Sequence, residues 1–443
     1  MQYKKIRYDF ECAIELFSVC NYRCEYCSGP RVKKRLRRGR TKSDIEQVVN
    51  FFNASGRTWL IGMSGGEPTI HPFFGEIVSR LRDHHFFYFF TNLSFDVERF
   101  MELLPADRVQ FMKTSLHPQA DLETFLGRFE TLFCYGYNPV LIIVSAPHTF
   151  ERIEYVARWC ADRQYPFTLS VMEGPYRDGN YPHDYTPEQV AFIERHTAEP
   201  GNLLRLHTRA SGGMNTLGLD CPAGKNSFFL DMESGDLMVC ESVNKVLGNI
   251  YQGTFSPQTQ NTRCPAINGC VGYDRSLTLP EAYRAFFTEG WNYWHVQDVK
   301  AANNYPDNLF LTIKADNTLA AHTVENALEA VRQRLGSART LCWGAGIYGT
   351  KLVQHLRELY GQDACPIVGF VDSLKDRQTT TVLGLPVYAP DPSILNGAEK
   401  ILITSYAYEQ DILACCQQLD IKSEVVALHQ DLLKPLGIEA AIF

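Results

Sequence analysis

Over the first 200 residues of this 443-residue chain, short apolar runs alternate with longer segments in which apolar residues recur every three or four positions. A short apolar run is typical of a buried strand, and the longer spacing is typical of a helix with one buried face. Strands are predicted at residues 12–19, 58–63, 86–91, 109–115, 140–144 and 167–172. Helices are predicted between them, at residues 41–52, 74–83, 96–104, 120–133 and 150–162. This alternation favours an α/β fold in which crossover helices join parallel strands.

The rest of the chain shows two further patterns. Residues 228–232 and 237–239 are predicted strands on either side of the turn-forming sequence ESGD, which indicates a β-hairpin. From residue 340 onward, a short apolar strand, a glycine-rich turn and a helix are followed by predicted strands at 366–371, 400–404 and 425–428. This second alternation predicts a separate C-terminal α/β domain.

Composition and charge narrow the class of protein. Hydrophobic residues make up 45% of the chain and charged residues 21%, which excludes a disordered or fibrous protein. The net charge is −7, so no overall basic field is present for wrapping nucleic acid. No apolar run reaches the roughly 18 residues of a membrane span, and the N-terminal sequence lacks the apolar core of a secretory signal. We therefore expect a cytoplasmic protein without a membrane or nucleic-acid partner.

Three of the 14 cysteines, Cys20, Cys24 and Cys27, form a C-x3-C-x2-C motif after the first predicted strand. A disulfide framework is not expected in a reducing compartment. Three thiolates so close in sequence can instead bind one soft metal centre. Structural zinc, the alternative, normally takes four ligands. An iron–sulfur cluster with one iron left open to a small molecule therefore fits the count better.

With the aromatic Tyr26 before the third cysteine and the sequence SGGEP at residues 64–68, the motif resembles that of the radical S-adenosylmethionine (SAM) superfamily. The resemblance implies a [4Fe–4S] cluster on the three cysteines, SAM chelated at the open iron, and a partial (β/α)6 TIM barrel. It places Tyr26, Gly65, Gly66 and Glu67 at the SAM site. Glycines allow a close backbone approach, and a carboxylate can accept from an ammonium group. A flavodoxin- or ferredoxin-type donor would reduce the cluster, and SAM would be cleaved to a 5′-deoxyadenosyl radical.

Polar residues follow several of the predicted strands, where the chemistry of such barrels lies. Ser115 ends the fourth strand, and by analogy it would contact the ribose or carboxylate of SAM. His117 and Glu173 follow the fourth and sixth strands and are the candidates for substrate contact and catalysis. The alternative for each is a surface or strand-capping polar residue.

A second set of cysteines consists of Cys221, Cys240, Cys264 and Cys270. The predicted hairpin would bring the first two to the same end. The spacing resembles the SPASM extension of radical SAM enzymes in its shorter "twitch" form, which implies one auxiliary [4Fe–4S] cluster, with zinc as the alternative. Because all four ligands are present, we expect an electron-transfer or structural role rather than substrate binding.

A basic run, RVKKRLRRGR, occupies residues 31–40, close after Cys27. It is either a solvated loop, a clamp for an anionic substrate such as a nucleotide, or a dock for an acidic electron donor. RNA is the weakest of these interpretations, because the chain as a whole is acidic.

In the C-terminal part, Gly344, Gly346 and Gly349 form a G-x-G-x-x-G turn between a strand and a helix, and Asp372 ends the next strand. This unit can place an anion on a helix N-terminus and a ribose on the carboxylate. It resembles the Rossmann-like, doubly wound domains of sugar-modifying and glycan-assembly enzymes, which implies NAD or a nucleotide as ligand. The alternative is a degenerate domain used only for packing.

The predicted organisation is a radical SAM partial barrel at 1–205, a small β-hairpin auxiliary-cluster domain at 206–290, a helical connector at 291–336 and a Rossmann-like domain at 337–443. The predicted function is abstraction of hydrogen from a small anionic, sugar or nucleotide-linked substrate, leading to dehydrogenation, epimerisation or elimination. The twitch arrangement resembles that of aminocyclitol dehydrogenases. The alternative is a peptide-modifying maturase, which is weakened because few residues precede the first strand. A non-enzymatic iron–sulfur redox sensor is the third interpretation.

Overall fold

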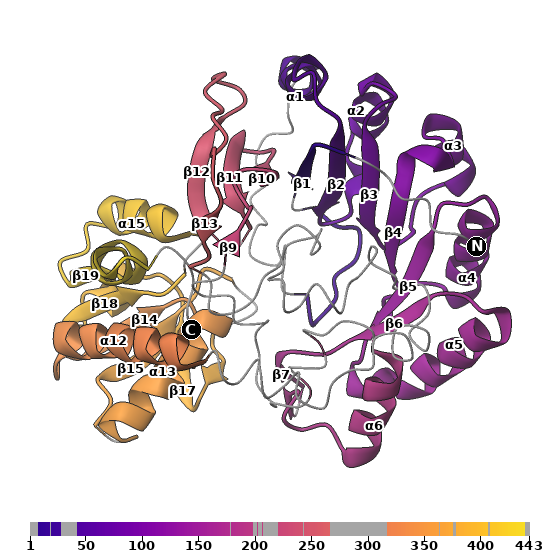
Figure 1. The fold of residues 1–443 in the computed structure, drawn as a ribbon. Coiled ribbons are helices and arrows are strands. Elements are labelled where there is room, and N and C mark those ends of the chain that lie inside the picture. The colour runs from indigo at the N-terminus through magenta and orange to yellow at the C-terminus, as the bar shows by residue number, and fades with distance from the viewer. Residues whose placement is uncertain are drawn as a thin grey trace. The chain divides into compact units, whose positions relative to one another are not determined.

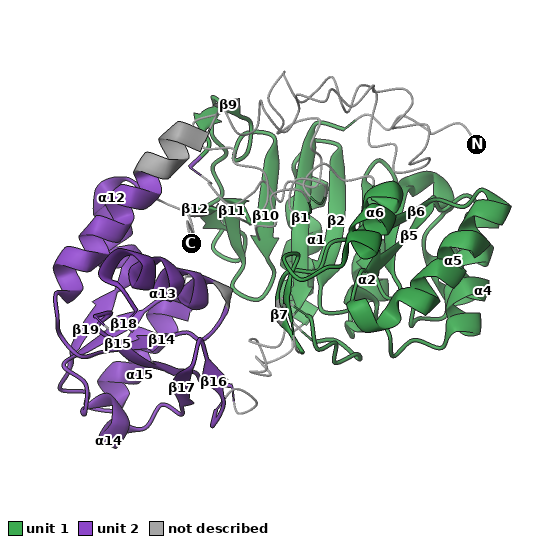
Figure 2. Cartoon of the chain, turned by 90° about the horizontal axis from the view of Figure 1, so that it is seen from below, with its two compact units in different colours: residues 1–214, 218–264, 269–310 green, residues 215–217, 265–268, 311–443 purple. Residues whose placement is uncertain are grey.

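The computed structural model describes residues 8–17, 19–27, 42–177, 179–197, 202, 206, 220–241, 243–265, 317–362, 364–374, 378–405 and 408–438. The chain divides into two compact units (Figure 2). Unit 1 comprises Met1–Met214, Gly218–Cys264 and Gly269–Phe310. Unit 2 comprises Asn215–Leu217, Pro265–Asn268 and Leu311–Phe443. No helix among the described residues is long and apolar enough to cross a membrane.

Unit 1 is built on a parallel sheet that the sequence pattern predicted. Neighbouring strands pair in parallel from β1 to β6, and the helices between them lie on the outer side of the arc (Figure 1). The strands are β1 (Phe10–Phe17), β2 (Trp59–Gly65), β3 (Phe86–Thr91), β4 (Val109–Ser115), β5 (Pro139–Val144) and β6 (Phe167–Ser170). The helices are α1 (Lys42–Ala54), α2 (Phe74–Arg80), α3 (Val97–Leu103), α4 (Leu122–Cys134), α5 (Phe150–Arg163) and α6 (Pro187–His196). The predicted partial TIM barrel is confirmed.

The two faces of this sheet carry different side chains. Successive side chains of a strand point to opposite faces of the sheet. Ile14 and Ile61 point outward and belong to the main core beneath the helices. On the inner face, Leu60, Tyr88 and Phe111 form a second buried apolar cluster. Because this inner cluster is apolar, we expect a site among the polar residues at the carboxyl ends of the strands.

The predicted hairpin exists but does not stand apart from the barrel. Strands β10 (Ser227–Asp231) and β11 (Asp236–Cys240) are antiparallel, and β12 (Val243–Asn249) adds to β11. β10 pairs in parallel with β1, so the described residues form a nine-stranded sheet in the order β12-β11-β10-β1-β2-β3-β4-β5-β6. An open barrel leaves the edge of β1 to be paired, and Phe228 and Leu230 of β10 join the main core. The sequence pattern gave no sign of this pairing.

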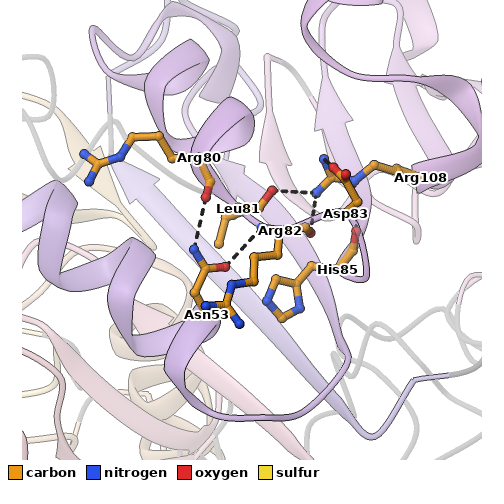
Figure 3. Close-up of polar contacts among 7 residues, drawn as sticks. All are labelled: Asn53, Arg80, Leu81, Arg82, Asp83, His85 and Arg108. Carbon is orange, nitrogen blue, oxygen red and sulfur yellow. Dashed lines mark hydrogen bonds and ion pairs between the residues drawn. The ribbon is translucent and has the colours of Figure 1, made fainter.

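A polar cluster closes the amino-terminal side of β3 and β4 (Figure 3). The Arg108 guanidinium donates to the carbonyl oxygens of Leu81, Arg82 and His85 at 3.0, 2.9 and 3.2 Å. Asn53 donates to the Arg80 carbonyl at 3.0 Å and accepts from the Arg82 N–H at 3.0 Å. These bonds satisfy carbonyls at the end of α2, which have no partner within the helix.

Unit 2 contains the second predicted α/β alternation. Its sheet has the order β16-β17-β15-β14-β18-β19, and all pairs are parallel except β16 with β17. The strands are β14 (Thr340–Trp343), β15 (Ile367–Val371), β16 (Thr381–Val382), β17 (Leu385–Tyr388), β18 (Lys400–Ile403) and β19 (Glu424–Ala427). The helices are α12 (Asn317–Leu335), α13 (Ile347–Tyr360), α14 (Pro392–Leu395) and α15 (Glu409–Gln418).

Candidate functional site

The turn after β2 packs directly on the backbone that leads into the cysteine loop. Gly66 donates its N–H to the Phe17 carbonyl at 2.9 Å, and Glu67 donates its N–H to the Val19 carbonyl at 3.0 Å. A Cβ atom on Gly65 would lie 2.3 Å from the Phe17 carbonyl oxygen, and one on Gly66 would lie 2.0 Å from that of Val19. Gly65 also has a φ of +120°, which L side chains rarely adopt. The glycines therefore permit close approach to the chain's own cysteine loop, and the predicted contact of Gly65 and Gly66 with SAM stays a prediction.

Glu67 links the ends of β2 and β3. Its side chain is 0% exposed. Among the described residues, its carboxylate accepts from the Asn92 N–H at 2.6 Å, from the Thr91 hydroxyl at 2.9 Å, and from the Thr69 hydroxyl and N–H at 2.6 and 3.2 Å. Burial raises the pKa of Glu67 above its ordinary value, while these donors limit the rise. The contact of Glu67 with SAM stays a prediction, and the structure gives its side chain a role in holding the strand ends together.

Asn92, directly after β3, reaches the cysteine loop. Its side-chain N–H₂ donates to Asn21 Oδ1 at 2.9 Å and lies 3.8 Å from Cys20 Sγ. The N–H of Tyr22 approaches the same sulfur at 3.4 Å. Burial raises the pKa of the Cys20 thiol, and these two donors lower it. Asn92 was not predicted as a site residue, although it directly follows a barrel strand, where the chemistry of such barrels lies.

The segment after β4 meets the other side of the loop. The Tyr26 hydroxyl and His117 Nδ1 are 3.0 Å apart, and Gln119 donates to the Arg23 carbonyl at 3.2 Å. The Cys24 thiol donates to Gln119 Oε1 at 3.5 Å. Burial lowers the pKa of His117 to about 4, so the ring is neutral at neutral pH. The structure thus brings Tyr26 and His117 together, and it adds Gln119, which the sequence analysis missed.

A small hollow lies beside this pair. It is lined by Tyr26, Leu116, His117, Pro118, Ile143, Val144, Thr149, Arg152 and Ile153. Ser115, at the end of β4, is half-buried and lies in register with Ile142 of β5. The predicted ribose contact of Ser115 stays a prediction.

A short antiparallel ladder holds the loop from a third direction. Strands β7 (Gly174–Tyr176) and β8 (Gly179–Tyr181) follow Glu173, which is half-buried. Arg177 Nε lies 3.4 Å from Glu25 Oε2, and the ring centroids of Tyr176 and Tyr26 are 6.2 Å apart. Glu173 therefore lies next to a segment that contacts the cysteine loop, while its catalytic role stays a prediction.

The second set of cysteines is brought together in part. Strand β9 (Asp220–Cys221) pairs with β13 (Thr262–Arg263). Arg263 lies opposite Asp220, and Cys264 directly follows Arg263. Cys221 and Cys240 pack against the same small apolar cluster of Ala223, Val239 and Val243. Cys270 lies outside the described residues, as does the basic run at residues 31–40.

In unit 2, the glycine-rich turn joins β14 to α13. Gly344 has a φ of +128°, and Gly346 occupies the N-cap of the helix. A Cβ on Gly349 would lie 1.9 Å from the Gly344 carbonyl oxygen, so helix and turn pack closely there. The carboxylate of Asp372 accepts from the N–H groups of Ala345 and Leu374 at 3.2 and 2.9 Å. Asp372 therefore lies at the glycine turn and supports it directly, while its predicted contact with a ribose stays a prediction.

The donor set of the cysteine loop fits an iron–sulfur cluster better than a single ion. The N–H of Cys27 donates to the Cys24 carbonyl at 3.1 Å, which closes a turn between these two thiols. Within the part of the chain that the structure describes, no group of three His, Cys, Asp or Glu side chains could hold one metal ion. Three thiolates suit a [4Fe–4S] cluster with one iron left open, whereas structural zinc normally takes four ligands.

Residues 14–178, which include this loop and the barrel strands, match the Radical SAM superfamily. The chain therefore carries a radical SAM superfamily domain. Such a domain indicates an enzyme and implies a [4Fe–4S] cluster and SAM. No curated protein matches the chain.

Several solved structures are similar to part of the chain. Native anSMEcpe with bound AdoMet is 16% identical with a TM-score of 0.40, over 55% of this chain and 78% of that one. Streptococcus suis SuiB bound to S-adenosylmethionine is 14% identical with a TM-score of 0.40, over 55% and 64%. BtrN in complex with AdoMet and 2-DOIA is 16% identical with a TM-score of 0.33, over 55% and 79%.

Proposed function

We propose that the chain is a radical SAM enzyme that takes a hydrogen atom from a sugar or nucleotide-linked substrate. The observation that carries the proposal is the meeting of three segments at the carboxyl ends of the barrel strands. They are the cysteine loop, the Gly65–Gly66 turn on its backbone, and Asn92 at the Cys20 sulfur. Cys20, Cys24 and Cys27 would hold the [4Fe–4S] cluster. With SAM bound, that cluster supplies the 5′-deoxyadenosyl radical that abstracts hydrogen from an unactivated C–H bond.

The residues around the loop would position the substrate and exclude water. His117 is neutral at neutral pH because burial lowers its pKa to about 4, so its ring offers one donor and one acceptor. Among the described residues, Tyr26 is the partner of His117 Nδ1, and we propose that Nε2 binds a hydroxyl group of the substrate or SAM. Glu173 lies beside the β7–β8 ladder and is the proposed acidic contact. Dehydrogenation, epimerisation or elimination would follow from how the substrate radical is quenched.

The second cysteine set would hold an auxiliary [4Fe–4S] cluster with an electron-transfer or structural role. Support comes from the β9–β13 pairing near Cys264 and from the shared packing of Cys221 and Cys240. Anaerobic reconstitution followed by iron and sulfide analysis tests it. We expect about eight irons per chain, and about four after Cys221→Ala and Cys240→Ala. Replacement of the exposed Cys134 by Ala is the matched control and should leave the iron content unchanged.

The substrate class rests on the C-terminal domain. The order of the parallel strands in unit 2 is that of a doubly wound sheet, and Gly344, Gly346, Gly349 and Asp372 lie at the turn where such folds bind nucleotides. We propose NAD or a nucleotide-linked sugar as the ligand. A ribose there would share the Asp372 carboxylate with the N–H groups of the turn. Equilibrium dialysis with NAD and with nucleotide sugars, in the native protein and in Asp372→Asn, tests this part.

A peptide-modifying maturase, the alternative function predicted from the sequence, is the second candidate. The two are separated by the substrate that stimulates SAM cleavage in the reconstituted enzyme. Stimulation by nucleotide sugars, and its loss in Asp372→Asn, would support the first function. Stimulation by peptides alone would replace it with the second.

A further inference from the structure

We infer that Asn92 raises the reduction potential of the cluster on Cys20, Cys24 and Cys27 by donating its side-chain N–H to the Cys20 thiolate. The inference rests on the proposed function, because it requires a cluster on these cysteines. It assigns a redox-tuning task to a residue outside the cysteine motif and outside the Gly65–Gly66 turn.

The contact is made from within the fold. Asn92 is 3% exposed, and its Nδ2 lies 3.8 Å from Cys20 Sγ. The backbone N–H of Tyr22 lies 3.4 Å from the same sulfur. Among the described residues, Cys20 therefore has two N–H donors, and the one from Asn92 can be removed by a side-chain substitution.

The orientation of the amide is fixed by its other bonds. Asn92 Oδ1 accepts from the Ser94 N–H at 3.0 Å, so the N–H₂ group must lie on the opposite side, toward the cysteine loop. That group also donates to Asn21 Oδ1 at 2.9 Å. The Asn92 backbone is held by Glu67 Oε2 at 2.6 Å, so the residue cannot swing away from the loop without breaking a buried, charge-assisted bond.

A hydrogen-bond donor at the Cys20 sulfur favours the reduced state of the cluster. On reduction, one electron passes from a flavodoxin- or ferredoxin-type protein to the cluster, and no bond breaks. That protein is oxidised by one electron, and the thiolate sulfurs become more negative. Hydrogen bonds to these sulfurs are one of the factors that set the potential of iron–sulfur clusters. The bond from Asn92 is partly buried, and electrostatic interactions are stronger there than in bulk water. Asn92 thus acts as a positioning residue and need not touch SAM or substrate.

The test compares Asn92→Ala and Asn92→Asp with Asn53→Ala. Asn53, in α1, makes two side-chain hydrogen bonds to the backbone of Arg80 and Arg82 (Figure 3) and none with the cysteine loop among the described residues. Each protein is reconstituted anaerobically and titrated with titanium(III) citrate, and the cluster is followed by electron paramagnetic resonance. The signal that changes on addition of SAM is the one recorded, which separates it from a second cluster.

We expect the equilibrium constant for reduction to fall about tenfold in Asn92→Ala, which is about 59 mV for one electron. It should fall further in Asn92→Asp, which replaces the donor by a negative charge. The cluster of Asn53→Ala should have the same reduction potential as that of the native protein. Native-like potentials in both Asn92 variants would overturn the inference while leaving the proposed function intact. Loss of iron from both Asn92 variants would overturn it too, because Asn92 would then be structural. A native protein that binds no iron would overturn the proposed function itself.

Discussion

Replacing Gly66 by alanine tests the close packing of the glycine turn on the cysteine loop. The new Cβ would lie 2.0 Å from the Val19 carbonyl oxygen and 2.9 Å from the Cys20 nitrogen. Real Cβ atoms essentially never come closer than 3.0 Å, so the Val19 carbonyl must move by about 1 Å. Because both neighbours are backbone atoms, no side-chain rotation can relieve the contact.

The cost follows from the bonds that this movement breaks. Gly66 and Glu67 donate to the Phe17 and Val19 carbonyls at 2.9 and 3.0 Å, and each such bond contributes about 1 kcal/mol. A loss of about 2 kcal/mol corresponds to a fall in melting temperature of about 4–8 °C for a domain of 150–250 residues. The cysteine loop moves as well, so we expect reconstituted iron to fall below the native amount.

The control is Gly127→Ala, in the interior of α4. Gly127 is exposed, and nothing lies within 4 Å of the Cβ position. Alanine is a better helix former than glycine by about 1 kcal/mol, so the melting temperature should rise. Thermal melts and iron analysis are run on both variants. If Gly66→Ala melts with the native protein and binds the native amount of iron, the packing argument is refuted.

Three further predictions follow from the same structure. In Glu67→Gln, the N–H₂ group would face one of the buried donors that now bond to the carboxylate. The free energy of unfolding, measured with urea, should fall by about 1–3 kcal/mol. Burial lowers the pKa of His85 from 6.5 to about 4, so the unfolded chain binds a proton that the folded chain does not, and stability should fall as the pH drops from 6.5 to 4. In His85→Asn, the difference between melting temperatures at pH 5 and pH 7 should shrink; an unchanged difference would contradict the assignment. Arg108→Lys loses bonds to backbone carbonyls and should cost about 2–4 kcal/mol. Asp83→Asn removes the charge of a fully exposed side chain from one ion pair and should leave the melting temperature at the native value.

Much of the barrel could be predicted because its signals are local. The predicted strands at Phe86–Thr91 and Val109–Ser115 coincide with β3 and β4, because the apolar residues of each strand lie close together in the sequence. The pairing of β10 with β1 could not be predicted, because it joins residues more than 200 positions apart and depends on which sheet edge is left open.

The candidate site, like the fold, could be predicted only in part. Cysteine spacing identified the loop, and a polar residue after a strand identified His117. Asn92 and Gln119 were missed because their importance lies in the direction of the amide group, which the sequence does not specify. For Glu67, the residue type predicted a ligand contact, which stays a prediction, and it did not predict the hydrogen bonds from Thr69, Thr91 and Asn92.

The most direct test of the account is the yield of 5′-deoxyadenosine from SAM. The anaerobically reconstituted protein is mixed with SAM and dithionite, and 5′-deoxyadenosine is quantified beside Cys24→Ala and the control Cys134→Ala. The account predicts product from the native protein and from Cys134→Ala, and none from Cys24→Ala. Equal product from Cys24→Ala, or none from a native protein that holds its iron and is supplied with nucleotide sugars and peptides, would contradict it.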